Sequence, residues 1–291
     1  MFSIGVSLIG TAVTFDPMSD ANLLNRKWQL ISVVVILGAL LVGGCATRRP
    51  QTAPVMLRVM TYNIHHGAGL DGKVDLTRIA ELIKQERADI VALQEVDKGV
   101  RRTARRDLTA ELASLTGMTG IFSNNFHFQG GEYGNAVLTR FPVKRWSNHH
   151  YQMLRTNEQR GILQLVLEVQ GREVVFLNTH IDSRPDDVER WLNVGEIETL
   201  TSKHAAKPVI LCGDFNTQPQ GRVYERLAHT FQDAWTRVGE GDGFSFPANG
   251  ANRRIDYIWF TRPEVLIPRK IWLPQSEASD HLPLVAEFEL R

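Results

Sequence analysis

The sequence predicts an α/β fold, and two observations support that prediction. Short apolar runs rich in β-prone residues, such as Ile90–Leu93 and Val209–Leu211, recur along the chain and are followed by polar or turn-forming residues. Between such runs, residues 75–83 and 185–203 carry apolar side chains at helical spacing. Residues 55–291 show neither a repeat nor an internal linker, so we expect them to form one domain.

Composition and charge are those of an ordinary globular protein. The 291 residues are 43% hydrophobic and 22% charged. The net charge of +1 argues against a strongly electrostatic nucleic-acid-binding protein, although it leaves room for local basic patches. The two cysteines offer no disulfide framework, and Cys212, within an apolar run, is expected to be a buried thiol.

Residues 1–45 have the pattern of a targeting segment. Arg26 and Lys27 precede an apolar run, Leu30–Val42, which is shorter than the roughly 20 residues that a membrane span needs. The run is followed by two glycines and Cys45, a pattern that resembles a bacterial lipobox. We therefore expect Cys45 to be lipidated, and a plain signal peptide or a single membrane anchor is the alternative.

Each of these alternatives places the folded domain at the cell envelope. Residues 1–17 contain no Lys or Arg, so Met18 is an alternative start. The residue after the cysteine is Ala46 rather than an acid, which by analogy with lipoproteins favours the outer membrane or its periplasmic face. Residues 46–54 are polar, contain proline and are expected to form a tether to the domain.

The first two predicted strands end in polar residues. Val55–Tyr62 is followed by Asn63, which is either a turn-forming residue or part of a site. Ile90–Leu93 is continuously apolar, as in a strand buried on both faces, and we expect it to end at Gln94 and Glu95. A carboxylate beside a buried strand end is costly unless it is exposed, paired or bound to a metal. Glu95 is therefore a candidate metal ligand, and an exposed loop acid is the alternative.

A dense arginine cluster lies between the second strand and the next helix. It forms either a solvated loop or a clamp for phosphate oxygens. Residues 130–135 are glycine-rich and are expected to form a turn-rich loop before a strand at Ala136–Thr139. Helix caps are expected at Asp75 and Asp107, with Gly117 ending the second helix. The cluster consists of Arg101, Arg102, Arg105 and Arg106.

A hairpin and a buried strand follow. Residues 161–169 and 173–177 flank Gln170-Gly171, a hairpin turn signal, and the second strand leads to His180, which as a lone histidine is more often structural than catalytic. Beyond Val209–Leu211, Asp214 and Asn216 lie two residues apart, so both would leave the sheet edge in the same direction. This places a possible base beside an orienting amide, and an Asx turn is the alternative.

The last segments add further acids and a histidine. Asp256 lies inside an apolar run at residues 254–260, so it needs a partner, and a structural salt bridge to Arg253 or Arg254 is one possibility. Asp280 and His281 precede the final strand, residues 284–290. Several strands thus end beside groups that suit metal-assisted phosphoester cleavage. Carboxylate and amide oxygens favour Mg²⁺, and the absence of a Cys/His cluster in the sequence argues against a structural zinc site.

These motifs, in this order, resemble those of the endonuclease/exonuclease/phosphatase superfamily. The resemblance spans nearly the whole of residues 55–291 and implies a four-layer α/β sandwich, two packed mixed β-sheets flanked by helices. The topology comes from the resemblance and not from the spacing of the residues. The motifs are Tyr62-Asn63, Leu93-Gln94-Glu95, Asn178-Thr179-His180, Gly213-Asp214-Phe215-Asn216, Ile255-Asp256-Tyr257 and Ser279-Asp280-His281.

The resemblance also implies roles for individual residues. Glu95 would be the main Mg²⁺ ligand, with Asn63 beside it and Asp280 near the metal, and Mn²⁺ is an alternative ion. Asp214 would activate the attacking water, and Asn216 would orient the water or the phosphate. The remaining implied roles are phosphate contacts for His180 and His281 and support of His281 by Asp256. Glu158 and Arg160 resemble the family's E-x-R strand start and would support the site. Arg160 and, from the arginine cluster, Arg102 are candidate substrate contacts.

The expected function is Mg²⁺-dependent hydrolysis of phosphodiester bonds at the cell envelope, by a monomer held to the membrane by its N-terminus. The substrate class stays open. The arginine cluster favours a nuclease acting on DNA or RNA, whereas the membrane tether favours a phosphodiesterase or phosphatase acting on lipid headgroups or glycolipids. Residues 131–135 and 158–161 resemble a bacterial branch allied to proteins that remodel glycosylphosphatidylinositol anchors. A non-catalytic binding lipoprotein is a third alternative.

Overall fold

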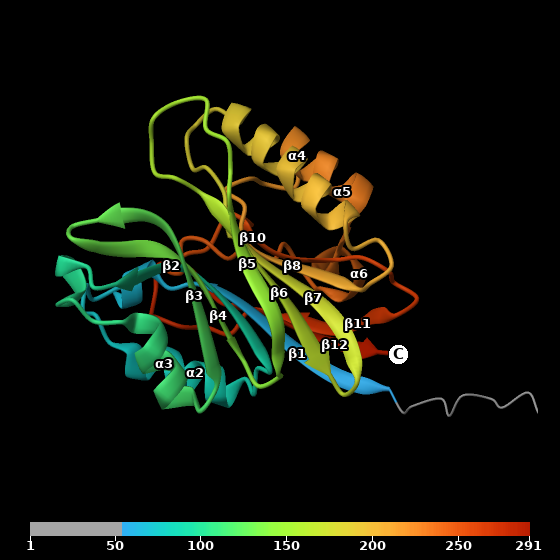
Figure 1. The fold of residues 1–291 in the computed structure, drawn as a ribbon, viewed down its shortest axis with the longest axis horizontal. Coiled ribbons are helices and arrows are strands. Elements are labelled where there is room, and N and C mark those ends of the chain that lie inside the picture. Colours follow the sequence, from blue (N-terminus) through green and yellow to red (C-terminus); the bar gives the residue numbers. More distant parts are fainter. Residues whose placement is uncertain (1–53) are drawn as a thin grey trace, which may run out of the picture. The chain divides into compact units, whose positions relative to one another are not determined.

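The computed structural model describes residues 54–291, which form two six-stranded sheets packed against each other (Figure 1). The predicted signal segment with Cys45, and residues 46–53 of the predicted tether, lie outside the described residues. Among the helices that the structure describes, none combines the length and the apolar character needed to cross a bilayer.

Both sheets are mixed, with one parallel pair of strands near the centre of each. The first sheet contains, in spatial order, β11 (Leu266–Trp272), β12 (Leu284–Leu290), β1 (Val55–Asn63), β2 (Ile90–Lys98), β4 (Gly131–Thr139) and β3 (Thr119–Phe128). The second contains β5 (Val143–His150), β6 (Gly161–Val169), β7 (Arg172–His180), β8 (Val209–Asp214), β10 (Asp256–Phe260) and β9 (Gln232–Asp233).

Helices cover the outer face of each sheet and complete the four layers. The pair α2 and α3 packs on the first sheet, and the pair α4 and α5 packs on the second (Figure 1). The expected four-layer α/β sandwich is therefore confirmed. The helices are α2 (Leu76–Gln85), α3 (Leu108–Thr116), α4 (Val188–Ser202), α5 (Arg222–Thr230) and α6 (Ala234–Val238), with short 3₁₀ turns η1 (His65–Gly67) and η2 (Arg101–Thr103).

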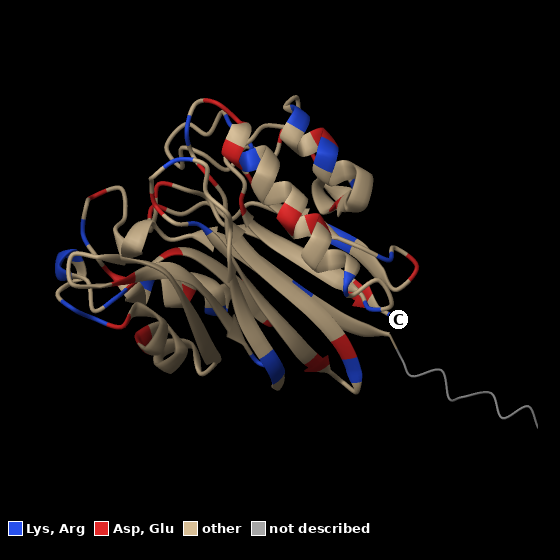
Figure 2. Ribbon diagram, turned by 45° about the horizontal axis from the view of Figure 1, so that its top comes forward, with Lys and Arg blue, Asp and Glu red and all other residues tan. Residues whose placement is uncertain are grey.

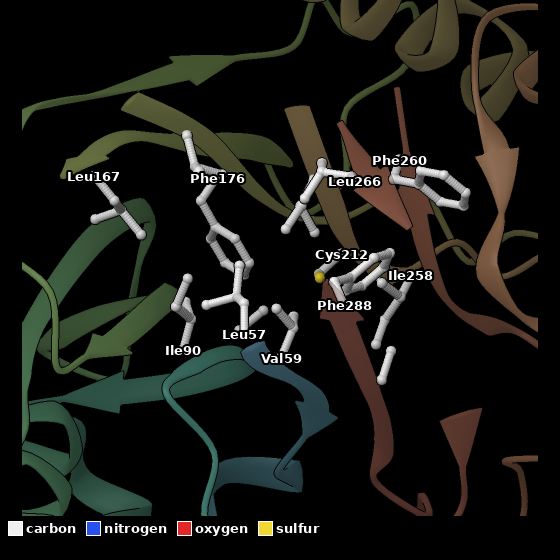
Figure 3. Packing of buried hydrophobic residues seen from close by; sticks show 14 of the residues in the cluster. Leu57, Val59, Ile90, Leu167, Phe176, Cys212, Ile258, Phe260, Leu266 and Phe288 are labelled. Atoms are coloured by element: carbon white, nitrogen blue, oxygen red, sulfur yellow. The ribbon is translucent and has the colours of Figure 1, made fainter. Parts of the chain in front are cut away.

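The main core lies between the two sheets. Side chains such as Leu57 and Val59 of β1 face Phe176 of β7 and Ile258 of β10 across the sheet interface (Figure 3). Burying such apolar side chains is the dominant favourable contribution to folding. Cys212 lies in this core as a free thiol, as predicted, and burial raises the pKa of the thiol well above its ordinary value.

The expected local signals form as predicted. The Asp75 side chain accepts a hydrogen bond from the Thr77 backbone N–H, and Asp107 accepts one from the Ala110 N–H, so each caps a helix. Gly117 ends α3 with φ of 69°, in the left-handed region. The turn between β6 and β7 is formed by residues 170 and 171, which both have positive φ.

The prediction of a turn-rich loop at residues 130–135 is wrong. Only its first residue lies outside a strand, because β4 begins at Gly131. Gly134 serves a close approach of two strands, since a Cβ atom there would lie 1.9 Å from the Ser123 carbonyl oxygen of β3.

Strands β3, β5 and β11 were not predicted. Strand β5 lies at a sheet edge and carries exposed charges such as Lys144 and Arg145, which hide its alternation.

Charged residues are concentrated in the loops and helices, and the strands carry few of them (Figure 2). The loops beyond the carboxyl ends of β1, β2, β7 and β8 belong to this charged region. Because β1 pairs with β2 in parallel, and β7 pairs with β8 in parallel, the ends of each pair meet at one edge of their sheet. This arrangement places the predicted polar residues together.

Candidate active site

A cleft of about 360 Å³ opens at this edge, between the ends of the two sheets. Most of the predicted site residues line it. The two exceptions, Asn63 and Asp256, lie directly behind it and form hydrogen bonds with lining residues. The predicted residues in the lining are Glu95, Arg102, Arg160, His180, Asp214, Asn216, Asp280 and His281.

Strand register accounts for the centre of the site. His180 at the end of β7 pairs with Asp214 at the end of β8, and Asp214 pairs with Asp256 at the start of β10. The three side chains therefore form one row across adjacent strands. Asp214 Oδ2 lies 3.5 Å from His180 Nε2 and accepts a hydrogen bond from Asn63 Nδ2 at 3.1 Å. Burial and the neighbouring Asp256 charge raise the pKa of Asp214 to about 7.

The Gly-Asp-x-Asn segment forms an Asx turn and also contributes to the site. The Asn216 backbone N–H donates to Asp214 Oδ1 at 2.9 Å, with Asn216 in the left-handed region at φ of 45°. The Asn216 amide nitrogen thereby lies 3.1 Å from His180 Nε2. A side chain at Gly213 would clash with β7, because its Cβ would lie 2.0 Å from the Thr179 carbonyl oxygen. The two alternatives predicted for this segment are thus compatible.

His281 and Asp256 form a buried pair. His281 Nδ1 lies 2.8 Å from Asp256 Oδ2, which also accepts a hydrogen bond from the Ser245 hydroxyl at 2.6 Å. Burial alone would lower the pKa of His281, but the adjacent Asp256 carboxylate outweighs this and raises the pKa to about 10. The suggested salt bridge from Asp256 to Arg254 is wrong, because Arg254 donates to Asp233 at 2.6 Å.

His180 is held in the opposite state. Arg160 Nη1 lies 3.1 Å from His180 Nδ1, and because a guanidinium can only donate, Nδ1 accepts this bond. Burial, followed by the charges of Arg160 and His281, lowers the pKa of His180 well below its ordinary value. Arg160 is itself paired with Glu158 at 3.1 Å, so the predicted Glu-x-Arg segment supports the cleft.

Glu95 enters the cleft because β2 does not end where the sequence indicated. The strand continues to Lys98, and its register with β4 shifts between Leu93 and Val96. In this bulge Glu95 has a φ of 59°, in the left-handed region. The neighbouring Gln94 donates a hydrogen bond to Asn178 Oδ1 of the other sheet at 2.7 Å. Glu95 accepts one hydrogen bond, from Asn63 at 3.1 Å, and forms no ion pair within residues 54–291.

The arginine cluster separates into different environments. Arg102 donates from Nε and Nη2 to both carboxylate oxygens of the buried Asp97, each at 2.8 Å, and lines the cleft. Arg106 instead pairs with Glu111 outside the cleft, and Arg101 and Arg105 are exposed and do not line it. Of the four, Arg102 alone is placed to meet a ligand in this cleft.

Sequence reasoning missed two parts of the cleft lining. One is an aromatic wall formed by Phe126, Phe128 and Tyr133, and the other is a set of residues from several loops. Phe126 and Phe128 of β3 face Tyr133 of β4, and the Arg102 guanidinium lies over the rings of Phe128 and Tyr133 at 5.0 and 5.4 Å. The two-residue spacing of the phenylalanines marks one face of a strand and was the available signal. The remaining lining residues not predicted are His65, Ser183, Phe246, Arg253 and Ile255.

Two sets of groups could hold a metal ion. Ligand atoms of Asp214, Asp256 and His281 lie within 4.8 Å of one another. Within that set, His281 Nδ1 is already paired with Asp256 Oδ2 at 2.8 Å. Glu95 and Asp280 instead present carboxylate oxygens to the cleft, and such a donor set fits a hard divalent cation. Ser279 Oγ donates to the Asn63 carbonyl at 2.7 Å and ties the loop of Asp280 to β1.

A model of the Endonuclease/Exonuclease/phosphatase family matches residues 60–281. The chain belongs to this family. Members of the Endonuclease/Exonuclease/phosphatase family are phosphoester hydrolases that generally depend on a divalent metal, and the chain is accordingly a phosphoric ester hydrolase.

Three proteins are similar to this chain over at least 70% of its length. The uncharacterized protein YbhP of Escherichia coli (strain K12) is 25% identical over 82% of this chain and 99% of its own length. A 5′-tyrosyl-DNA phosphodiesterase of Caenorhabditis elegans is 27% identical over 70% of this chain and 58% of its own length. The human nocturnin catalytic domain, solved with a bound sulfate anion, has the same fold, with a TM-score of 0.65, 23% identity and coverage of 82% and 98% of the two chains.

Proposed function

We propose that the protein is a Mg²⁺-dependent phosphodiesterase whose reaction takes place in the cleft at the strand ends. One observation carries the proposal: Asp214, with its pKa raised to about 7, lies between a neutral histidine and a protonated one. A group with this pKa can accept a proton near neutral pH. Both imidazoles line the cleft, and the protonated one can donate to a bound anion.

The chain's own residues support each part of hydrolysis. Glu95, with Asn63 and Asp280, would hold the ion, which supplies Lewis-acid assistance and neutralises phosphate charge; Mn²⁺ is a second ion compatible with oxygen ligands. Asp214 takes a proton from the attacking water. His281 Nε2 lies 3.7 Å from Asp214 Oδ2, so the imidazole is close to the reacting centre.

The other polar groups orient the substrate and balance its charge. Asn216 holds the water or a phosphate oxygen, and His180 contacts the phosphate. Preorganised donors of this kind stabilise charge that develops in the transition state. Arg102 and Arg160, which both line the cleft, contact the anionic or planar parts of the substrate.

We also propose that the enzyme acts at the cell envelope, as a monomer anchored through a lipidated Cys45. The lipobox-like pattern supports this location. Two substrate classes remain candidates for different reasons. The aromatic wall of Phe126, Phe128 and Tyr133 favours a substrate with a planar group, such as a nucleotide. The proposed membrane anchor favours a lipid headgroup or glycolipid diester.

The test measures cleavage of bis-p-nitrophenyl phosphate, plasmid DNA, RNA and phospholipid vesicles by the full-length protein. We expect turnover with Mg²⁺ or Mn²⁺ that stops when a chelator is added. Asp214→Asn should lower kcat by at least about 100-fold without lowering the melting temperature, whereas Asp242→Asn, an exposed control, should leave kcat unchanged. Turnover of none of these substrates by the wild type, or full turnover by Asp214→Asn, contradicts the proposal.

A further inference from the structure

A second cleft of about 360 Å³ adjoins the first one. The two clefts share Asn216, Arg253 and Ile255 in their linings. Arg190 of α4 and Gly221, just before α5, complete the second cleft together with polar residues of the intervening loop, Thr217, Gln218 and Gln220. The two clefts are therefore direct neighbours, separated only by residues that line both.

Arg190 is buried without a carboxylate partner. Its side chain lines the second cleft although the residue is only 7% exposed. Nη1 donates to the backbone carbonyls of Asp182 and Arg184, whereas Nε has no hydrogen-bond partner. Burial lowers the pKa of Arg190, whereas the nearby charges of Asp182 and Asp187 raise it. A buried cation in this condition is costly unless a ligand supplies the missing anion.

The carboxylates nearest to Arg190 are already engaged elsewhere. Asp182 pairs with Arg184 at 2.9 Å, Asp186 with Arg155 at 2.8 Å, and Asp187 with Arg222 at 2.7 Å. None of them forms an ion pair with Arg190 in the part of the chain that the structure describes. The positive charge is therefore left facing the cleft.

Arg253 adds a second positive charge on the ridge between the clefts. Its guanidinium stacks on Phe246 at 4.5 Å, and the Phe246 ring in turn packs on His281 at 4.7 Å. The Arg253 backbone forms hydrogen bonds with Phe246 that hold the two together. Arg253 forms no ion pair with another described residue and is exposed. Its charge is thus free for a ligand and is fixed relative to the catalytic histidine.

The start of α5 faces the same cleft. Gly221 is the N-cap residue, it lines the cleft, and it has no side chain to cap the helix. Uncapped backbone N–H groups and the helix dipole favour an anion at such an end. This observation is independent of the two arginines and indicates the same ligand charge.

We propose that the second cleft is a subsite for an additional phosphate group of the substrate, held by Arg190 and Arg253. The inference rests on the proposed function, because it takes the scissile phosphate to lie beside His180 and His281. The enzyme would then prefer phosphodiesters that carry a further phosphate next to the bond that is cleaved. A neighbouring nucleotide and a phosphorylated lipid headgroup both supply such a group.

Binding of paired ligands to the full-length protein tests the inference without requiring turnover. Calorimetry compares thymidine 3′,5′-bisphosphate with thymidine 5′-monophosphate, and inositol 1,4-bisphosphate with inositol 1-phosphate. We expect the bisphosphate to bind about tenfold more tightly than the monophosphate in at least one pair, as for one added charge-assisted contact. A preference in the thymidine pair identifies the source as nucleic acid, and a preference confined to the inositol pair identifies a headgroup.

Variants test whether Arg190 and Arg253 cause the tighter binding of the bisphosphate. Arg253→Gln should reduce the affinity ratio to near one, and Arg190→Gln should do the same if it folds. Arg101→Gln, which removes an exposed arginine outside both clefts, should preserve the ratio. Equal affinities in both pairs, no detectable binding of either bisphosphate, or an unchanged ratio in Arg253→Gln overturns the inference. Failure of the proposed function is recognised separately, as absent metal-dependent cleavage of bis-p-nitrophenyl phosphate.

Discussion

His281 Nδ1 and Asp256 Oδ2 are 2.8 Å apart, and both residues are at least 95% buried. The pair joins the first residue of β10 to the loop before β12, and the Ser245 hydroxyl fixes the carboxylate from a third segment. Because the partner charge is adjacent and water is excluded, the imidazole is held protonated. A protonated imidazole that points its Nε2 toward the cleft is a ready donor to a phosphate oxygen.

Asp256→Asn should therefore change the charge of His281. With a pKa of about 10 in the folded protein, His281 stays protonated through neutral pH, and the resulting stability is fully present below 6.5 and lost as pH rises through 10. In the variant, burial still lowers the pKa of His281, and only the weaker charges of other groups raise it. The pKa of His281 therefore falls, and we expect the ring to be neutral near pH 7.5. We expect kcat to fall about 100-fold.

NMR titration of the histidine resonances in metal-free protein checks this directly. The His281 signal of the wild type should not titrate between pH 6 and 8.5. Unfolding measured at pH 7.5 and at pH 10 should show a loss of stability in the wild type that is smaller in Asp256→Asn. Asp242→Asn provides the matched control. A wild-type His281 that titrates near 6.5 would rule out the ion pair.

Glu95→Gln distinguishes the two possible metal sites. A neutral amide replaces a carboxylate that forms no ion pair within the described residues, so Mn²⁺ affinity should fall at least about tenfold. Electron paramagnetic resonance of free Mn²⁺ measures the affinity at equilibrium. Glu81→Gln, on the exposed face of α2, serves as the control. If Asp256→Asn weakens Mn²⁺ binding and Glu95→Gln does not, the metal belongs to the Asp214, Asp256 and His281 set.

Much of this site was predictable because its residues follow strands. Asn63, His180 and Asp214 are the last residues of β1, β7 and β8, and parallel pairing brings such ends together. The bulge that turns Glu95 into the cleft left no signal, since it depends on pairing with β4, a long-range partner. For the same reason the sequence could not show that Arg254 pairs with Asp233 and leaves Asp256 to His281.

The aromatic wall was missed for a different physical reason. Phe126, Phe128 and Tyr133 lie on a hairpin whose strand β3 contains asparagines and a register shift, which weaken the alternation of apolar residues. Gly134 was interpreted as a turn residue, because a glycine needed for a close strand contact has the same letter as one needed for a turn. Such ambiguity is resolved only by the neighbouring strand.

Arg102→Gln should destabilise the protein although Arg102 is partly exposed. Its guanidinium satisfies both oxygens of Asp97, whose side chain is 0% exposed, and the variant would leave a buried carboxylate without its counter-charge. We expect a loss of roughly 3 kcal/mol in the free energy of unfolding. Urea unfolding measures it, with Arg101→Gln from the same cluster as the exposed control. Equal stabilities of the two variants would show that the Arg102–Asp97 pair contributes nothing beyond an ordinary surface contact.

Cys45→Ser tests the proposed envelope anchor independently of the active site. The cysteine follows an apolar run too short for a typical span, with Arg26 and Lys27 before it, so lipidation at Cys45 would supply the membrane attachment. In the variant no acyl chains can be added at this position. We expect it to leave the membrane fraction and appear in the soluble fraction of cells, with phosphodiesterase activity per molecule unchanged. Ala46→Ser is the neighbouring control and should remain membrane-bound. A Cys45→Ser protein that stays in the membrane fraction after washing with high salt would instead indicate that Leu30–Val42 is retained as an uncleaved anchor.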